Sequence, residues 1–299
     1  MKRKLIKQGL GGYTVTVPVN WIREYNLDAG NEVNVTEVEG GLMITGELSK
    51  RERKIEIVVL QSFTKRMIHN LIYQAYRLGY DVIKIKFEKE SQLNFVKSVV
   101  NYLIGFEIVK NGKDFCVLEN IAEPDVEKFE VMLRKLFLQI LELTETVYSD
   151  VNSEIFNDLN ETKLLIDRLT NYIRRTIIRA KYGAEKSSLL YAIASKLSLI
   201  CHEYYYLYEY LSNKNLKVSK SVLKMLNDTN ILFRKFYDAF YKKDYKVLFE
   251  IGEEKLKLFS LNDSLLEKSK GIDNVVLANI REIIRLTQMC ATFTIGYRL

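Results

Sequence analysis

Proline is almost missing from this chain of 299 residues, which contains only Pro18 and Pro124. A proline inside a helix removes a hydrogen bond and clashes with the preceding turn. Its absence from residues 125–299 therefore leaves that whole region free to form long, uninterrupted helices.

Cysteine and histidine are also scarce. The three cysteines, Cys116, Cys201 and Cys290, are odd in number and far apart, so they form neither a disulfide framework nor a metal-binding spacing. We expect buried free thiols. The two histidines leave few general bases, and the "GLGG" segment lacks the Lys-Ser/Thr of a phosphate-binding loop and leads into a strand. No enzyme is predicted.

Long apolar runs are missing as well. No run approaches the roughly 18 residues that span a bilayer, and the basic start "MKRKLIKQGLGG" is not followed by the apolar segment of a secretory signal. We therefore expect a cytoplasmic protein without membrane insertion. With 47% hydrophobic and 28% charged residues, the composition is that of a folded protein with two or more domains. The net charge of +7 is compatible with an anionic partner.

The first 48 residues differ from the rest, because half of the 14 glycines lie between Gly9 and Gly46. Alternation in "YTVTV" predicts a strand, "PVNWIREYNL" a short helix with Pro18 near its first turn, and "NEVNVTEVEGGLMITGEL" a hairpin turning at Gly40–Gly41. The predicted order is β-β-α-β-β. Such a unit is too small to close a core alone, so it needs a partner, and a symmetric dimer supplies one.

Positive charge is concentrated in the same segment. The cations are Lys2, Arg3, Lys4, Lys7 and, on the short helix, Arg23. A basic strand beside a Gly-rich loop can lie along nucleic-acid phosphates. The alternative is a solvated edge strand whose charges prevent aggregation.

Residues 49–54 form a charged linker, and residues 55–121 predict a small β-α-β-α-β-β domain. The first helix, from Phe63 to Leu78, has Gly79 as its C-cap and an apolar stripe formed by Phe63, Met67, Leu71 and Leu78. The second helix is expected to be N-capped by Ser91 and to end at Gly105, and the final hairpin to turn at Asn111–Gly112.

Residues 124–299 form a third, all-helical domain. Apolar residues at helical spacing predict six helices with short loops, which pack antiparallel as a bundle and suggest two three-helix units in tandem. The expected ranges are 124–149, 153–181, 185–213, 218–242, 245–268 and 273–297.

One of these helices carries the tyrosine-rich run "CHEYYYLYEYL". Tyr204, Leu207 and Leu211 share a stripe that we expect in the core. The run's remaining tyrosines either pack within the bundle or form a protein interface. They are Tyr205, Tyr206, Tyr208 and Tyr210.

The first segment, from "RKLIKQGLGGYTVTVPVNWIREYNL" to "AGNEV" and the closing hairpin, resembles the AbrB/SpoVT swapped-hairpin DNA-binding domain in its archaeal form. The resemblance implies that two chains interleave their hairpins in one dimeric barrel whose basic residues bind DNA. By position, the DNA-binding residues would be Lys2, Arg3, Lys4, Lys7 and Arg23. The shared dimer core would contain Tyr13, Val15, Val17 and Trp21.

The remainder extends the resemblance. "RMIHNLIYQAYRLGYDVIKIKF" and "VKSVVNYLIGFEIV" look like the segment that joins this domain to a PhoU helical domain in archaeal phosphate-uptake regulators. The resemblance implies a multidomain α+β protein that regulates transcription for phosphate uptake. Its helical domain would contact the ATPase of a phosphate ABC transporter or a signalling protein. The alternative is an adaptor of such a transporter that binds no DNA and uses its N-terminal unit only for dimerisation.

PhoU domains often bind metal clusters through carboxylates spaced four residues apart, and iron, zinc or magnesium would be the metals to consider. At the matching positions this chain retains Asp167 and Glu282 but has Lys163 and His202 where acids are expected. Glu154 and Asp158 have the four-residue spacing, but such pairs are more often solvated helix faces. We therefore predict no metal site.

Overall fold

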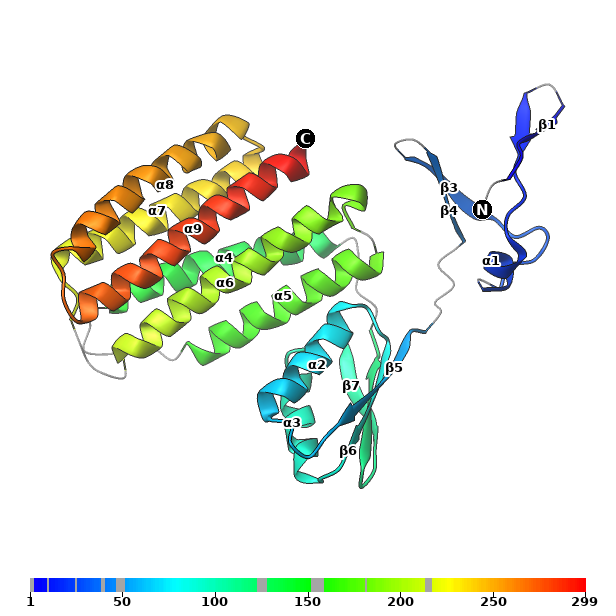
Figure 1. Cartoon of the computed structure of the whole chain (residues 1–299), viewed down its shortest axis with the longest axis horizontal. Helices are drawn as coiled ribbons and strands as arrows, with labels where there is room; N and C mark the ends of the chain where they lie inside the picture. Colours follow the sequence, from blue (N-terminus) through cyan, green and yellow to red (C-terminus); the bar gives the residue numbers. More distant parts are fainter. Residues whose placement is uncertain are drawn as a thin grey trace. The chain divides into compact units, whose positions relative to one another are not determined.

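A computed structural model describes the chain except for residues 1–2, 10, 25, 39–40, 47–51, 123–127, 152–158, 181 and 213–216. Its contacts divide the chain into two units, Met1–Arg53 and Lys54–Leu299. Half of the predicted 49–54 linker, residues 49–51, lies outside the described residues, and Lys54 begins the first strand of the second unit. The architecture is mostly helical with small sheets, as expected for an α+β protein (Figure 1).

Unit 1 has the predicted order β-β-α-β-β. Its elements are β1 (Ile6–Gln8), β2 (Gly12–Thr14), α1 (Val19–Glu24), β3 (Val33–Val38) and β4 (Gly41–Gly46). The strands form two separate antiparallel hairpins, β1–β2 and β3–β4. Pro18 directly precedes α1, and its carbonyl accepts the hydrogen bond of the Ile22 N–H. Gly40, at the expected hairpin turn, lies outside the described residues.

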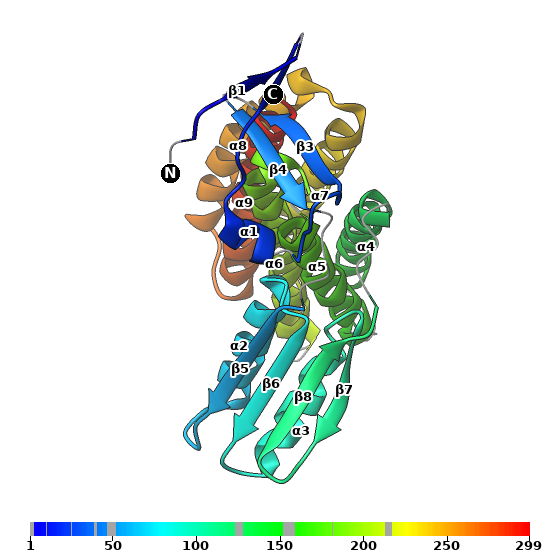
Figure 2. The same cartoon turned by 90° about the vertical axis from the view of Figure 1, so that its right-hand side faces the viewer.

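Unit 2 begins with an α/β subdomain, residues 54–120. It contains β5 (Lys54–Val59), α2 (Lys65–Arg77), β6 (Val82–Phe87), α3 (Ser91–Val100), β7 (Phe106–Asn111) and β8 (Phe115–Asn120). The sheet order is β5-β6-β8-β7, with β5 parallel to β6 and the other pairs antiparallel. Both helices lie on one face of the sheet and leave the other face open (Figure 2).

Both ends of α2 are fixed by residues that commonly begin or end helices. The Thr64 hydroxyl accepts the Met67 N–H at the start of the helix, and Gly79 follows its last turn with φ +81°. The left-handed backbone conformation that this position requires favours glycine. The predicted helix end at Gly79 is therefore correct.

The predicted stripe on α2 faces the wrong way. Met67, Leu71 and Leu78 are exposed, whereas the residues buried against the sheet are Ile68, Ile72, Ala75 and Tyr76. Successive residues are about 100° apart around a helix, so this helix has two adjacent apolar faces. The buried face is the one formed by Ile68 and Ile72, each of which directly follows an exposed residue of the predicted stripe.

The second helix of this subdomain also differs from the prediction. Ser91 is the first residue of α3 and not its cap, and the helix ends at Val100, well before Gly105. The side chain of Gln92 holds the N-terminus instead, because its amide oxygen accepts the Lys89 N–H at 3.1 Å. Its amide nitrogen donates to the Leu60 carbonyl at 2.9 Å.

A helical bundle follows. Its helices are α4 (Phe129–Asp150), α5 (Asn160–Ala180), α6 (Ser187–Ser212), α7 (Lys220–Lys242), α8 (Tyr245–Leu266) and α9 (Ile272–Arg298). Helices α4, α5 and α6 contact one another, as do α7, α8 and α9, and α6 packs along α9. None of the helices in the described ranges is long and apolar enough to cross a membrane.

The bundle and the α/β subdomain each have their own hydrophobic core. The three cysteines are buried free thiols, as predicted, and burial raises the pKa of Cys116 to about 12. Tyr204, Leu207 and Leu211 lie in the bundle core, also as predicted. Tyr208 is buried too and donates to Asp150 at 2.9 Å, whereas Tyr206 is exposed.

Arg175 of α5 connects the two parts of unit 2. Its fully buried guanidinium donates to the carbonyls of Tyr76 and Tyr80, at 2.9 and 2.7 Å, and to the Asp81 carboxylate at 2.8 Å. Arg179, one turn further on, holds the other Asp81 oxygen at 2.9 Å. The end of α2 is therefore fixed to the bundle by a buried polar cluster, in which the Arg175 Nε lacks an acceptor.

Candidate functional site

The first hairpin of unit 1 contains one of the predicted DNA-binding cations, Lys7, and begins shortly after Arg3 and Lys4. Ile6 pairs with Thr14, and Lys7 with Tyr13. Gly9 in the turn has φ +58°, which favours glycine, and a Cβ on Gly9 or Gly11 would meet no atom within 4 Å. The backbone of this turn is therefore open to a ligand.

Four of the five predicted cations lie in the described part of unit 1, and all four side chains are exposed. They are Arg3, Lys4, Lys7 and Arg23, whereas Lys2 lies outside the described residues. None of the four makes an ion pair with a described residue. Residues 1–23 contain no aspartate or glutamate. The described cations of this segment are therefore not neutralised by ion pairs with described residues.

Unit 1 also exposes apolar side chains. Of its side chains with a described environment, none is buried. Tyr13 is 63% exposed and Val15 41% exposed, and Val17 and Trp21 are half-buried. Further exposed apolar residues are Leu5, Ile6, Val19, Val33, Val35 and Leu42. The described side chains of a single copy therefore form no buried core, and the shared dimer core stays a prediction.

The metal-site candidates are already engaged by nitrogen groups. The Asp167 carboxylate lies 2.9 Å from His202 Nε2 and 3.4 Å from Lys163 Nζ, and Glu282 pairs with Arg285. Glu154 and Asp158 lie outside the described residues. Within the described ranges, no three histidine, cysteine or acidic side chains come together in a way that could hold a metal ion.

Near these candidates, burial and then the neighbouring Glu282 carboxylate raise the pKa of Glu203. Two acidic groups on α6 and α9 therefore lie close enough to repel each other. The structure thus brings Asp167 together with His202, and Glu203 near Glu282, but it does not join the two pairs into one described cluster.

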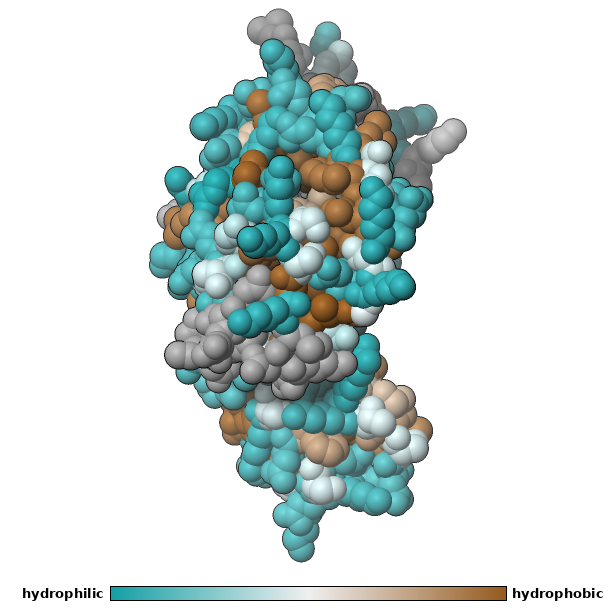
Figure 3. Space-filling model, turned by 90° about the vertical axis from the view of Figure 1, so that its left-hand side faces the viewer, coloured by the Kyte–Doolittle hydropathy of each residue, from teal (hydrophilic) through white to brown (hydrophobic). Residues whose placement is uncertain are grey.

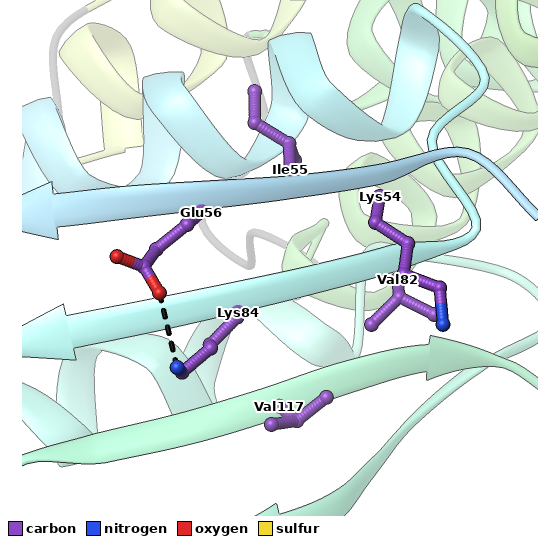
Figure 4. Close-up of a pocket in the computed structure, with 6 residues that line it drawn as sticks. All are labelled: Lys54, Ile55, Glu56, Val82, Lys84 and Val117. Atoms are coloured by element: carbon purple, nitrogen blue, oxygen red, sulfur yellow. Dashed lines mark ion pairs between the residues drawn. The ribbon is translucent and has the colours of Figure 1, made fainter.

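A shallow hollow of about 260 Å³ lies on the open face of the sheet (Figure 4). Its lining comes from three strands and consists of Lys54, Ile55, Glu56, Val82, Lys84 and Val117. The Glu56 carboxylate accepts hydrogen bonds from the Nζ of Lys84 at 3.0 Å and of Lys86 at 2.7 Å. These two hydrogen bonds lower the pKa of Glu56. The charges of Glu56, Lys84 and Lys86 therefore pair with one another across β5 and β6.

Sequence reasoning missed a pair of arginines, Arg77 on α2 and Arg174 on α5. For Arg174 the signal was the segment "YIRRTII", in which two adjacent arginines interrupt an apolar run, and nothing in the sequence singled out Arg77. Charged residues in such a run are buried together with apolar neighbours, where they need partners.

Compared with known proteins, the chain matches no family model, no curated protein and no solved structure.

Proposed function

We propose that the protein is a DNA-binding transcriptional regulator that acts as a homodimer. The observation that carries the proposal is the first segment of unit 1, in which five cations and no acid lie within 23 residues. The four described cations are exposed, and Lys7 lies on the strand that leads into the glycine turn. Such a surface suits the phosphate backbone of duplex DNA, which is bound mainly by charge and by backbone N–H groups.

Dimerisation follows from the exposed apolar side chains of unit 1. Two short, separate hairpins whose described side chains are all exposed or half-buried are not expected to be stable alone. A second copy would cover Tyr13, Val15 and Trp21 and bring two basic segments together. This arrangement is the one implied by the resemblance to swapped-hairpin domains.

By the same resemblance, the process regulated is phosphate uptake. The bundle would then serve as the sensing and interaction domain, with a phosphate ABC transporter ATPase or a signalling protein as partner. We propose no catalytic activity.

The test is salt-dependent binding to duplex DNA by wild type and by a Lys2→Ala, Arg3→Ala, Lys4→Ala variant. The slope of log K against log salt is about −0.9 per neutralised phosphate. Three cations in each of two chains would contribute up to about 5 to this slope. We expect the variant to lose most of its affinity and to show a correspondingly shallower slope.

A matched control removes three exposed lysines from unit 2, Lys220, Lys224 and Lys257. This control changes the net charge equally but should leave the slope nearly unchanged. Equal losses in both variants would mean that only net charge matters. Unchanged affinity in the unit 1 variant would show that these cations do not bind DNA.

The adaptor without DNA binding remains a second candidate, because apolar side chains are also exposed on the bundle. Phe249 and Leu256 of α8 are exposed and lie seven residues apart, on one face of the helix. The face drawn in Figure 3 is largely hydrophilic, with hydrophobic side chains visible between polar ones. An intact dimer with no DNA retention at low salt would favour the adaptor.

A further inference from the structure

Two arginines approach each other where the α/β subdomain meets the bundle. Arg77 belongs to the last turn of α2 and Arg174 to α5, which lies between α2 and α6 (Figure 1). The Arg77 Nε donates to the Asn171 side chain at 2.9 Å. The guanidinium carbon of Arg174 lies 5.7 Å from the centre of the Tyr191 ring of α6. Three helices therefore surround the pair.

Arg174 is buried without a hydrogen-bonding partner. It is only 8% exposed, and its Nε has no acceptor. In the described part of the chain its guanidinium makes neither a hydrogen bond nor an ion pair, and the Tyr191 ring is its one polarisable neighbour. Burying a charge without a partner is costly, so this group lacks an anion that would complete its surroundings.

The charges around the pair do not supply that anion. Burial and then the nearby Arg77 lower the pKa of Arg174 to about 10. Asp167 is the carboxylate that attracts both arginines, but it lies two turns earlier on α5 and is engaged by Lys163 and His202. Two positive charges at the Arg77–Arg174 pair therefore remain without a direct counter-charge.

The adjacent Arg175 shows the contrast. It is fully buried and its Nε, like that of Arg174, has no acceptor, yet its two terminal nitrogens donate to two carbonyls and a carboxylate. Arg175 is therefore compensated by several acceptors, whereas Arg174 has none among the residues that the structure describes.

We propose that Arg77 and Arg174 bind a phosphate group, either free phosphate or the phosphate of a small organic molecule. Guanidinium groups bind phosphate oxygens through paired, charge-assisted hydrogen bonds. A phosphate group carries about −1.5 to −2 charges at neutral pH, which matches the two uncompensated cations. The ligand would touch the α/β subdomain and the bundle at once. This site goes beyond the proposed function, because it assigns a ligand to unit 2 whether or not unit 1 binds DNA.

The experiment titrates the full-length protein with inorganic phosphate by calorimetry, at constant ionic strength set with chloride. Parallel titrations use ATP, as a phosphorylated organic molecule, and succinate, as a dicarboxylate. The variants are Arg174→Met and Arg77→Met. The control is Arg234→Met, which removes an exposed arginine of α7 that pairs with Glu145.

We expect the wild type to bind inorganic phosphate, ATP or both. The Arg234→Met control should bind each of these compounds with the same affinity as the wild type. Loss of one charge-assisted hydrogen-bonding group should weaken binding about tenfold or more in Arg174→Met and in Arg77→Met. Tighter binding of ATP than of inorganic phosphate would identify a phosphorylated organic ligand, and the reverse would identify free phosphate.

Three results would overturn the proposal. One is no binding of either phosphate compound to wild type. Another is equal binding by wild type and Arg174→Met, which would place the ligand elsewhere. The last is succinate binding as tight as that of phosphate, which would show a general anion site. Circular dichroism of each variant confirms that a loss of binding is not a loss of fold.

Discussion

Replacing Arg175 by methionine should destabilise unit 2 more than most substitutions in the chain. The change removes donors from the carbonyls of Tyr76 and Tyr80 and one of the two arginines that hold Asp81. Breaking a buried ion pair by removing one partner costs about 3–5 kcal/mol, and a buried carbonyl left without a donor costs about 1–3 kcal/mol. Arg179 still holds Asp81, and methionine fills most of the volume. We therefore expect a loss of about 3–5 kcal/mol in the free energy of unfolding.

The assay is equilibrium unfolding in urea, followed by far-ultraviolet circular dichroism, which reports mainly the helices of unit 2. Trp21, the only tryptophan, lies in unit 1, so its fluorescence follows that unit separately and should not change. Arg174→Met is the matched control in phosphate-free buffer. It removes a neighbouring buried arginine that lacks acceptors, so it should cost little or even stabilise the fold.

A double substitution completes the experiment. Adding Asp81→Asn to Arg175→Met removes the carboxylate whose partner was lost, so the two losses should not add. A loss below about 1 kcal/mol for Arg175→Met, the level of an exposed ion pair, would refute the role of this cluster in joining the two parts of unit 2.

Two glycine substitutions should have opposite signs in the same urea assay. Gly105→Ala should cost more than about 1 kcal/mol, because φ is +83° and the new Cβ would lie 2.6 Å from the Ala122 carbonyl oxygen. Gly252→Ala, in an open position of α8, should stabilise by about 0.5–1 kcal/mol; a loss there would contradict the open surroundings. Burial lowers the pKa of His69 below its usual 6.5, so the unfolded chain takes up a proton first as the pH falls. The wild type should therefore lose stability below about pH 6.5, and a His69→Gln variant should lack this part of the pH dependence when both are unfolded at a series of pH values.

The helices of the bundle were predictable because their signal is long and repeated. For α7 and α8 the expected ranges, 218–242 and 245–268, differ from the observed Lys220–Lys242 and Tyr245–Leu266 by two residues at one end. Each helix spans several turns of apolar periodicity, so single residues do not change the outcome. The order of strands and helices in both units was predictable for a different reason, because alternating residues and Gly or Pro positions mark the short elements.

Side-chain orientation was harder to predict where two faces of an element carry similar residues. Helix α2 has apolar residues on adjacent faces, and only packing on the sheet decides that Ile68 and Ile72 are buried while Met67 and Leu71 are exposed. Ser91 failed as a cap because the Gln92 side chain holds the start of α3. Such choices depend on partners distant in sequence, which no local pattern contains.

The two adjacent arginines of α5 show why the candidate ligand site could not be found in the sequence. Arg174 and Arg175 are both buried arginines, adjacent in the sequence. Adjacent residues point about 100° apart around a helix. Arg175 therefore reaches the carbonyls at the end of α2, whereas Arg174 lies against Tyr191 of α6. Both arginines nevertheless lie against the end of α2. Arg175 donates to carbonyls there, and Arg174 lies near Arg77, which belongs to the last turn of α2. An anion shared by Arg77 and Arg174 would therefore strengthen the contact between α2 and α5 that Arg175 already makes. Binding at this site and the attachment of the α/β subdomain to the bundle would then be linked, because a ligand that bridges two packed elements stabilises the state in which they are packed.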